Sequence, residues 1–330
     1  MKKTLVFENT YFSLFVFFLY DKNWKSYDYL LWGNRFDHDF VEHLSNYVNV
    51  LDYSYQSIPR LISKSSKSFI QYYKDKRNLC HVVREYDNCI GNVRELNNPV
   101  ISVNRVQIDD GVGTTHFELI NGPKKLSYFS SLLKLIFLRE PVKIEKTNKF
   151  ILTKKINVTE GYRDKCSTLN MNERWSLLPD SEKKEILSIF RVSIEDFEEI
   201  TGESAILFTQ PFSENRSDYS EDDKVKGYKE LVESYNISES NLIIKPHPAE
   251  KTNYAEKFPE SIVIRPSFPA ELMPLLGVNV DKVLSVATNA AECFKGNCNL
   301  IFYSKGASYF NFPESLKNKL NAMELESWKK

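Results

Sequence analysis

A lysine and a histidine held between prolines are the residues of this chain best suited to chemistry. They form the segment Lys245-Pro-His-Pro248, which follows the apolar run Leu242–Ile244. Because proline restricts the backbone, the turn is expected to hold the imidazole of His247 in a defined direction. A positive charge and a proton donor placed in this way suit a phosphate. The competing interpretation is a rigid surface bend without chemistry.

Three more predicted strands in the second half end in polar residues suited to the same ligand: Thr209-Gln-Pro211, Pro266-Ser-Phe-Pro-Ala-Glu271 and Ser285-Val-Ala-Thr-Asn289. Ser285 and Thr288 offer hydroxyls where a helix begins, beside free backbone N–H groups. Glu271 offers a carboxylate for paired ribose hydroxyls. Each residue also has a competing interpretation: Ser285 and Thr288 would be helix caps, Glu271 a charge in a first helical turn, and Gln210 an ordinary loop residue.

Two adjacent carboxylates form the other candidate site, in Val106-Gln-Ile-Asp-Asp-Gly-Val-Gly113. Neighbouring carboxylates in a partly desolvated cleft oppose each other's ionisation, so one of Asp109 and Asp110 is expected to have a raised pKa and to act as a general base. Simple turn chemistry is the alternative. A divalent-cation site that adds His116 is disfavoured, because the spacing matches no compact metal motif.

The elements that position these residues follow from the apolar pattern. The first half predicts strands at 3–8, 28–32, 47–51 and 99–108, with helices at 11–20 and 58–73. The second half predicts strands at 205–209, 242–244, 262–265, 282–286 and 299–303, with helices at 222–235, at 270–276 and from 289. This alternation predicts parallel sheets, which bind ligands at the carboxyl ends of their strands.

The length of 330 residues suits two domains of ordinary size. Residues 143–200 are rich in Lys, Glu, Asn, Asp and Ser, with short apolar insertions and a helix predicted at 180–189. This change in composition places the domain boundary there. We therefore predict a first domain at 1–155, a connection at 156–200 and a second domain at 201–330.

Composition excludes several classes of protein. Basic and acidic residues balance at 44 each, so no net field attracts nucleic acid. Five scattered cysteines without a CxxC pair indicate reduced thiols and a cytoplasmic protein. The apolar run at 14–20 is far shorter than the roughly 20 residues of a membrane span. The aromatic face of the helix at 11–20 nevertheless offers a contact for the inner membrane face or a partner chain.

Together these motifs carry a family resemblance. Asp109-Asp-Gly111, Lys245-Pro-His-Pro248 and the Ser285/Thr288 segment resemble the acidic-glycine, HP and serine motifs of bacterial sialyltransferases. With Ala205–Phe212 and Phe268–Glu271, the pattern is similar to glycosyltransferase family 52, the lipooligosaccharide and capsule sialyltransferases. The resemblance implies an α/β GT-B architecture of two Rossmann-like domains facing a central cleft. It also implies CMP-N-acetylneuraminate held mainly by the C-terminal domain.

The resemblance also implies roles for individual residues. Asp109 would take a proton from an acceptor galactose hydroxyl, and His247, assisted by Lys245, would stabilise or protonate the departing CMP phosphate. The other implied donor-site residues are Pro248, Ser267, Phe268, Glu271, Ser285, Thr288, Gln210 and Pro211. Alternatives for the base are Asp110, Asp222 and Asp223. Candidates for the acceptor side are Tyr11, Phe12, Trp24 and Trp32, with core packing as the competing interpretation.

The implied reaction is an inverting sialyl transfer that needs no metal and no cofactor beyond the donor. Its partners would be a CMP-sugar and an oligosaccharide or glycolipid acceptor, without nucleic acid; a homodimer stays open. Three alternatives remain: another donor (CMP-Kdo or a UDP-hexose), a nucleotide-sugar binder without catalysis, and a metal-dependent hydrolase. The hydrolase would use Asp109, Asp110, His116 and His247 as ligands.

Overall fold

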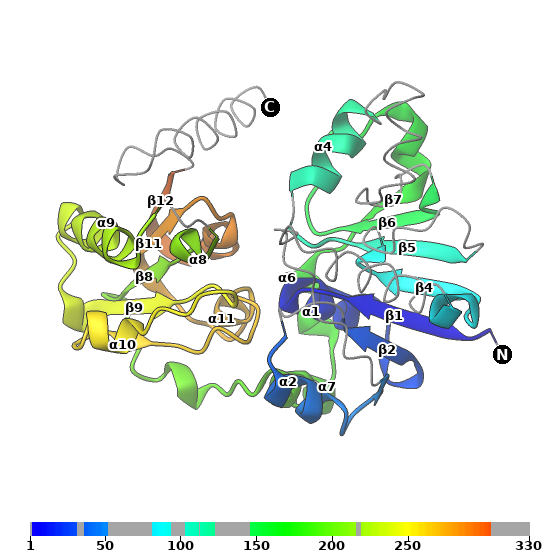
Figure 1. The fold of residues 1–330 in the computed structure, drawn as a ribbon, viewed down its shortest axis with the longest axis horizontal. Helices are drawn as coiled ribbons and strands as arrows, with labels where there is room; N and C mark the ends of the chain where they lie inside the picture. The colour runs from blue at the N-terminus through cyan, green and yellow to red at the C-terminus, as the bar shows by residue number, and fades with distance from the viewer. Residues whose placement is uncertain are drawn as a thin grey trace, which may run out of the picture. The chain divides into compact units, whose positions relative to one another are not determined.

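In a computed structural model the chain divides into two compact units, Met1–Phe190 and Arg191–Lys330. The structure describes residues 2–31, 36–51, 81–93, 103–111, 113–122, 146–215 and 219–304. Figure 1 shows that each unit is built on its own set of adjacent strands with helices packed against them. The helix predicted at 58–73 and Trp32 lie outside the described residues.

The described part of the first unit contains one sheet of seven parallel strands. In order across the sheet they are β3 (Asn49–Val50), β2 (Asp28–Leu31), β1 (Thr4–Glu8), β4 (Asn88–Gly91), β5 (Asn104–Ile108), β6 (Lys149–Leu152) and β7 (Cys166–Thr168). In the register, Val6 lies opposite Tyr29 on one side and Ile90 on the other. The strand order reverses between β1 and β4, and ligands of such sheets bind at that point.

Helix α1 (Tyr11–Tyr20) forms the aromatic centre of this unit. It begins at Thr10, whose side chain accepts a hydrogen bond from Ser13 N. All of its side chains except Phe12 and Tyr20 are buried. The ring of Phe18 lies 4.7 Å from that of Trp24, and both are fully buried. The expectation that α1 contacts a membrane or a partner chain is therefore wrong, because its aromatic face is used for core packing.

The remaining helices described in this unit are short. They are the α-helices α2 (His38–Leu44), α4 (Gly113–Asn121), α6 (Met171–Leu177) and α7 (Asp180–Phe190), with 3-10 turns η1 (Trp24–Ser26) and η4 (Glu160–Lys165). The ring of Phe15 on α1 lies 6.0 Å from that of Trp175 on α6 and 6.1 Å from that of Phe190 on α7. His43 Nε2 on α2 lies 2.9 Å from Ser188 O on α7.

The predicted connection at 156–200 requires correction. Strand β7 extends the first sheet, with Ser167 opposite Ile151 on β6, and α6 and α7 pack on α1 and α2. The division between units therefore falls after Phe190, and most of the predicted connection completes the first unit. Its polar composition misled because α6 and α7 bury only a few apolar side chains, such as Trp175 and Ile186.

The described part of the second unit contains a five-stranded parallel sheet. Its order is β10 (Ile262–Val263), β9 (Leu242–Lys245), β8 (Ala205–Phe208), β11 (Val280–Val286) and β12 (Cys298–Ser304). Strand β8 lies at the centre, with Ile206 opposite Ile243 on one side and Val283 on the other. Every residue of β8 and β9 is buried, as a sheet covered on both faces requires.

Short helices connect these strands. They are α8 (Phe212–Asn215), α9 (Glu221–Ser234), α10 (Tyr254–Lys257) and α11 (Leu272–Leu275), with 3-10 turns η5 (Glu195–Phe197), η6 (Glu239–Asn241) and η7 (Ala290–Phe294). The longest, α9, packs Tyr228, Leu231 and Val232 into the same core as Leu207, Leu242 and Leu284. The predicted strands and helices of this half are confirmed, except that the helix expected from 289 is the 3-10 turn η7.

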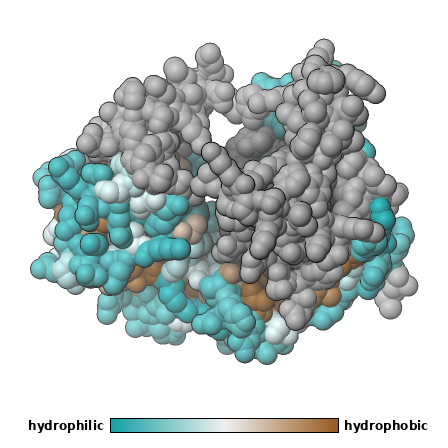
Figure 2. Space-filling view, viewed as in Figure 1, coloured by the Kyte–Doolittle hydropathy of each residue, from teal (hydrophilic) through white to brown (hydrophobic). Residues whose placement is uncertain are grey.

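The surface agrees with this distribution of apolar side chains. On the face drawn in Figure 2, the described residues are mainly hydrophilic, and apolar residues occupy small patches. The large apolar side chains exposed among the described residues are Leu177, Ile194 and Leu300. Within the same residues, every helix is too short or too polar to span a bilayer.

The packing of α1 on α6 and α7 predicts the effect of one truncation. We expect Phe15→Ala to lower the free energy of unfolding by about 3–5 kcal/mol, because it removes a buried ring between two helices. Leu177→Ala, at a side chain that is 69% exposed on α6, is the matched control and should change it by less than about 0.5 kcal/mol. Chemical denaturation followed by tryptophan fluorescence measures both. Equal effects would contradict the assignment of 156–190 to the first unit.

Candidate active site

Asp109 follows β5 and is nearly fully buried, with 3% of its surface exposed. Its Oδ1 accepts a hydrogen bond from Gly111 N at 3.0 Å. Its Oδ2 accepts two from Thr153, from the backbone N at 2.9 Å and from Oγ1 at 2.7 Å. His116 Nε2 lies 3.2 Å from Oδ1, within ion-pair distance but outside hydrogen-bond geometry. The carboxylate is therefore fixed at the end of its strand.

These contacts decide the charge of Asp109. Burial raises its pKa, but the combined effect of the adjacent His116 and the donors of Thr153 is larger and lowers the pKa to about 2. A raised pKa was expected for one of Asp109 and Asp110, and Asp109 is not that residue. Asp109 is ionised at neutral pH, and as a weak base it can accept a proton that is already leaving. The neighbouring Asp110 is half-buried, and its Oδ2 accepts a hydrogen bond from Asn92 Nδ2 at 3.1 Å.

The raised pKa belongs instead to Glu8, the last residue of β1. Burial raises its pKa well above the usual value; the hydrogen bond from Ser13 lowers it and the charge of Asp110 raises it again. Ser13 Oγ donates to Oε2, while Oε1 is buried without a hydrogen-bond partner. The neighbouring Gly91 has φ +120, and a Cβ there would lie 2.7 Å from Glu8 Oε1 and 2.2 Å from the carbonyl oxygen of Phe7. Only glycine fits beside this neutral acid.

Side-chain amides connect these strand ends. Asn92 Nδ2 donates to Asn9 Oδ1 as well as to Asp110, and Gln107 Nε2 donates to Asn92 Oδ1 at 3.3 Å. The ends of β1, β4 and β5 thus share one polar cluster at the point where the strand order reverses. Sequence reasoning missed Glu8, Asn9 and Asn92, although polar residues directly after the apolar run Leu5–Phe7 were the available signal.

The aromatic candidates for the acceptor side separate into two kinds. Tyr11 and Trp24 are buried core residues, and Tyr11 donates from its hydroxyl to Asp37 Oδ2 at 3.0 Å. Phe12 is half-buried, and its ring lies 3.7 Å from the position that a Cβ on Gly111 would occupy. The structure thus places Phe12 next to the acidic turn and gives Trp24 a packing role.

In the second unit, β9 leads into the turn that carries His247. The imidazole Nδ1 accepts a hydrogen bond from Ala249 N at 3.0 Å. A ring nitrogen that accepts carries no proton, so the neutral ring holds its proton on Nε2. His247 N donates to Glu250 Oε2 at 2.8 Å, and Glu250 N donates back to His247 O at 2.9 Å. The turn is closed at both ends, and Pro248 beside it is exposed.

Lys245 joins this turn to the loop after β10. It is buried; its Nζ donates to Pro266 O at 3.0 Å and lies 4.4 Å from the ring centre of Phe268. Burial lowers its pKa to about 7, although the charges of Glu271 and Glu250 raise it. Lys245, Phe268 and Glu271 are therefore neighbours, as expected for one ligand site. Ser267, between them in the same loop, is half-buried.

The hydroxyls of Ser285 and Thr288 shape the turn after β11. Ser285 is fully buried and donates to Thr288 O at 2.7 Å, while Thr288 Oγ1 accepts from Ala290 N at 3.3 Å. Ala287 between them adopts a left-handed conformation with φ +57. The N-cap of η7 is Asn289 and not Thr288, and contact of either hydroxyl with a phosphate stays a prediction.

The remaining candidates lie near β8 and α9. Gln210 N donates to Tyr228 OH at 2.8 Å, its Nε2 donates to Thr209 O at 3.0 Å, and Pro211 is buried. Asp222 is 93% exposed in the first turn of α9, 4.0 Å from Lys257. Asp223 interacts with the helix cap, accepting a hydrogen bond from Ser220 Oγ at 2.6 Å. Both acidic residues are thus surface groups of the helix start.

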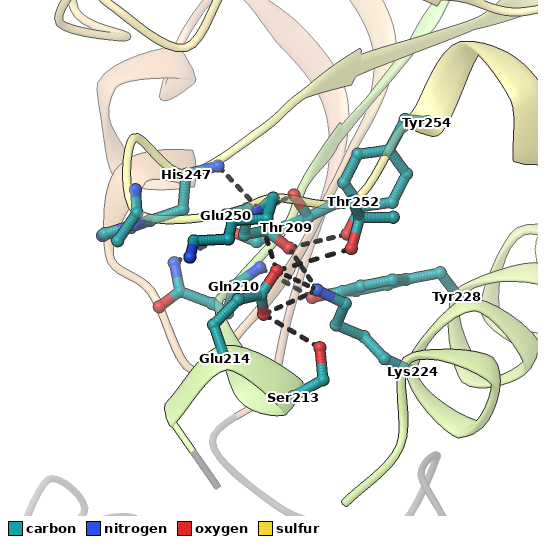
Figure 3. A network of polar contacts seen from close by, with 12 residues as sticks. Thr209, Gln210, Ser213, Glu214, Lys224, Tyr228, His247, Glu250, Thr252 and Tyr254 are labelled. Carbon is teal, nitrogen blue, oxygen red and sulfur yellow. Dashed lines mark hydrogen bonds and ion pairs between the residues drawn. The ribbon is translucent and has the colours of Figure 1, made fainter. Parts of the chain in front are cut away.

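Sequence reasoning missed the buried ionic network beside His247, drawn in Figure 3. Lys224 on α9 is fully buried; its Nζ lies 2.9 Å from Glu214 Oε2 and 3.1 Å from Glu250 Oε1. Thr209 and Tyr254 also donate to Glu250. In this view the imidazole lies on the side of the turn away from Lys224.

No three His, Cys, Asp or Glu side chains gather as metal ligands within the part of the chain that the structure describes. In the first unit, the metal-ligand candidates Asp109 and His116 contact each other directly. EDTA treatment is the direct test of the hydrolase alternative.

Solved structures define the class of this chain. The 2,6-sialyltransferase of Photobacterium sp. JT-ISH-224, in a ternary complex with CMP and lactose, superposes with a TM-score of 0.61 at 10% identity, over 97% of this chain and 76% of that one. A Photobacterium phosphoreum α/β-galactoside α-2,3-sialyltransferase gives 0.55 at 12% identity, over 98% and 95%. The GT-B domain of the Photobacterium damselae sialyltransferase gives 0.53 at 13% identity, over 91% and 90%. The chain is an α/β protein with the GT-B fold.

Sequence comparison gives the family. Residues 109–295, more than half of the chain, match the model of glycosyltransferase family 52, and the chain belongs to that family. A Haemophilus influenzae protein described as uncharacterized is 34% identical over 149 residues, which are 44% of this chain. The match spans about half of that relative, 47% of its length.

The neutral state of Glu8 predicts a pH-dependent stability. Its pKa is raised above the usual 4.5 in the folded protein, so its contribution to stability is complete below about pH 4.5 and is lost as the pH rises through the folded-state pKa. Glu8→Gln should therefore match the wild type near pH 4.5 and exceed it increasingly at higher pH, by up to about 1.4 kcal/mol per pH unit. Denaturation curves from pH 4.5 to 8 measure the difference, with the exposed Glu85→Gln as control. A constant difference would show that Glu8 is charged in the fold.

Proposed function

We propose that this chain is an inverting, metal-independent sialyltransferase. It moves N-acetylneuraminate from CMP-N-acetylneuraminate to a terminal galactose-type hydroxyl of a surface glycan, a lipooligosaccharide or a capsule. The observation that carries the proposal is the rigid turn of His247, which fixes an Nε2–H donor at the end of β9 in a family 52 chain. The sialyltransferase with CMP and lactose bound supports the choice of donor and acceptor class.

The chemistry assigns one task to each unit. The reacting carbon of a sialyl donor ionises readily, so its transition state demands a stabilised leaving phosphate and only a modest base. His247, in the second unit, donates from Nε2 to the departing CMP phosphate. Asp109, in the first unit, is ionised and takes the proton from the acceptor hydroxyl as the new bond forms. One displacement inverts the anomeric carbon.

The donor contacts follow the strand ends of the second sheet. Lys245 supplies positive charge near the phosphate, Glu271 accepts from the ribose hydroxyls, and the turn from Ser285 to Thr288 offers its backbone N–H groups. The cytidine side and the rest of the site are lined by Gln210, Pro211, Pro248, Ser267 and Phe268. A glycolipid acceptor would place this cytoplasmic enzyme at the inner face of the membrane.

A donor screen tests the assignment. The protein is incubated with lactose and CMP-N-acetylneuraminate, CMP-Kdo or a UDP-hexose, with and without EDTA, and release of nucleotide is followed. We expect turnover with CMP-N-acetylneuraminate that EDTA leaves unchanged. Turnover with another donor alone would contradict the sialyl assignment, and loss of activity with EDTA would favour the metal-dependent alternative. Binding of CMP without turnover on any donor would favour a binding protein.

Substitutions test the two roles. Asp109→Asn should lower kcat by about 10²- to 10⁴-fold, because it removes the proton acceptor, and leave CMP affinity unchanged, because the proposed CMP contacts all lie in the second unit. His247→Gln should lower kcat and also weaken CMP binding. Asp222→Asn, at an exposed carboxylate, should keep the full rate. A full rate in Asp109→Asn together with a loss in Asp222→Asn would move the base to α9.

A further inference from the structure

The carboxylate of Glu250 bonds four groups of the protein and is not available to a ligand. Its side chain is 1% exposed and receives four hydrogen bonds. Oε1 accepts from Tyr254 OH at 2.7 Å and from Lys224 Nζ at 3.1 Å. Oε2 accepts from His247 N at 2.8 Å and from the hydroxyl of Thr209. A carboxylate has about four acceptor sites, so this one has none left for a ligand.

One of these bonds closes the turn that carries the imidazole. The carboxylate of Glu250 accepts from His247 N, and the N–H of Glu250 donates to His247 O. Within this loop Ala249 N donates to Nδ1 of the ring. Figure 3 shows the imidazole at one side of the turn, with Glu250 between it and the side chains of Lys224 and Tyr254. The orientation of the ring therefore depends on the turn, and the turn depends on Glu250.

The other bonds attach this turn to the body of the unit. Lys224 is fully buried and is shared between Glu250 and Glu214. Glu214 is held in turn by Lys251 N at 2.9 Å and Ser213 Oγ at 2.9 Å. The network thus spans α8, α9 and the segment after β9. The ammonium group of Lys224 has three oxygen partners, two on Glu214 and one on Glu250. This arrangement resists displacement, because moving the buried ammonium group would leave it without its partners.

We propose that Glu250 is a positioning residue that holds the His247 turn so that the neutral imidazole presents Nε2–H to a phosphate oxygen. That this phosphate belongs to CMP rests on the proposed function. The tautomer of His247 with its proton on Nε2 does not rest on it, because it follows from the hydrogen bonds of the turn. Glu250 touches no substrate in this scheme and acts only through His247. Preorganisation of this kind stabilises charge on a leaving group without reorganisation during the reaction.

The tautomer is the first test, and the chain suits it because it has only five histidines. In protein labelled with ¹⁵N-histidine, NMR distinguishes a protonated from an unprotonated ring nitrogen, and His247→Gln assigns the resonances. We expect an unprotonated Nδ1 and a protonated Nε2 for His247 in the wild type, and mixed tautomers in Glu250→Ala. The exposed Glu256→Ala on α10 is the matched control and should keep the wild-type signals. An unchanged tautomer in Glu250→Ala would overturn the proposal.

Kinetics supply the second test through a double-mutant cycle. Glu250→Ala should lower kcat about tenfold or more with a smaller change in KM, and Glu250→Gln should recover part of the loss, since its amide oxygen can still accept from His247 N. In a His247→Gln background, Glu250→Ala should have no further effect, because it acts through the ring already removed. Equal losses in both backgrounds would show that Glu250 acts elsewhere.

A milder variant keeps the test decisive if Glu250→Ala does not fold. Thr209→Val removes one donor to the same carboxylate oxygen that holds His247 N, with little change of shape. We expect a loss of about two- to fivefold in kcat that is again absent in the His247→Gln background; a loss of the same size there would overturn the proposal. Altered tautomers without turnover on any sugar donor would contradict the proposed function and leave the role of Glu250 standing.

Discussion

Both units depend on one constraint: a strand in a parallel sheet covered on both faces is mainly apolar. Strand β8 is apolar and buried throughout, and β9 is apolar up to its buried last residue, Lys245. Polar side chains then find room mainly where the strands end, and parallel strands all end at one edge of the sheet. For this reason Glu8 lies within electrostatic range of Asp110 in one unit, and in the other Thr209 and His247 both donate to the carboxylate of Glu250, despite their separation in the sequence.

The same constraint explains which elements the sequence alone could predict. The runs at 205–208 and 242–245 are continuous and bounded by polar residues, so their strands were predicted correctly. Strand β4 was missed because its apolar core is only Cys89-Ile90, and β6 and β7 were missed because they lie in the polar stretch 143–200 that was assigned to the domain connection. The domain boundary was misplaced because the rings that attach α6 and α7 meet Phe15, a residue about 160 positions earlier.

The candidate site, like the fold, could be predicted only in part from the sequence. Asp109 directly follows β5, Lys245 ends β9 and His247 comes two residues later, and a strand end is visible in a sequence. The role of Lys224 is not, because a lysine in a polar helix looks the same whether it faces solvent or a buried carboxylate. Its partner Glu250 is 26 residues away, and only the packing of α9 on the sheet brings them together. The hydrogen bond of the Ser285 hydroxyl to Thr288 O was likewise hidden in the sequence, because it forms in a turn where Ala287 has a positive φ.

Two buried carboxyl groups at one sheet edge show how local donors decide charge. Burial opposes ionisation in both Asp109 and Glu8. Asp109 has an adjacent imidazole and two donors from Thr153, and these outweigh burial, so its pKa falls to about 2. In Glu8 burial outweighs the hydrogen bonds from Ser13 and the backbone of Asn9, and the charge of Asp110 adds to it, so its pKa is raised well above the usual value. The two carboxyl groups are buried alike, so the donors around each one, and not burial, account for the opposite directions of their pKa shifts.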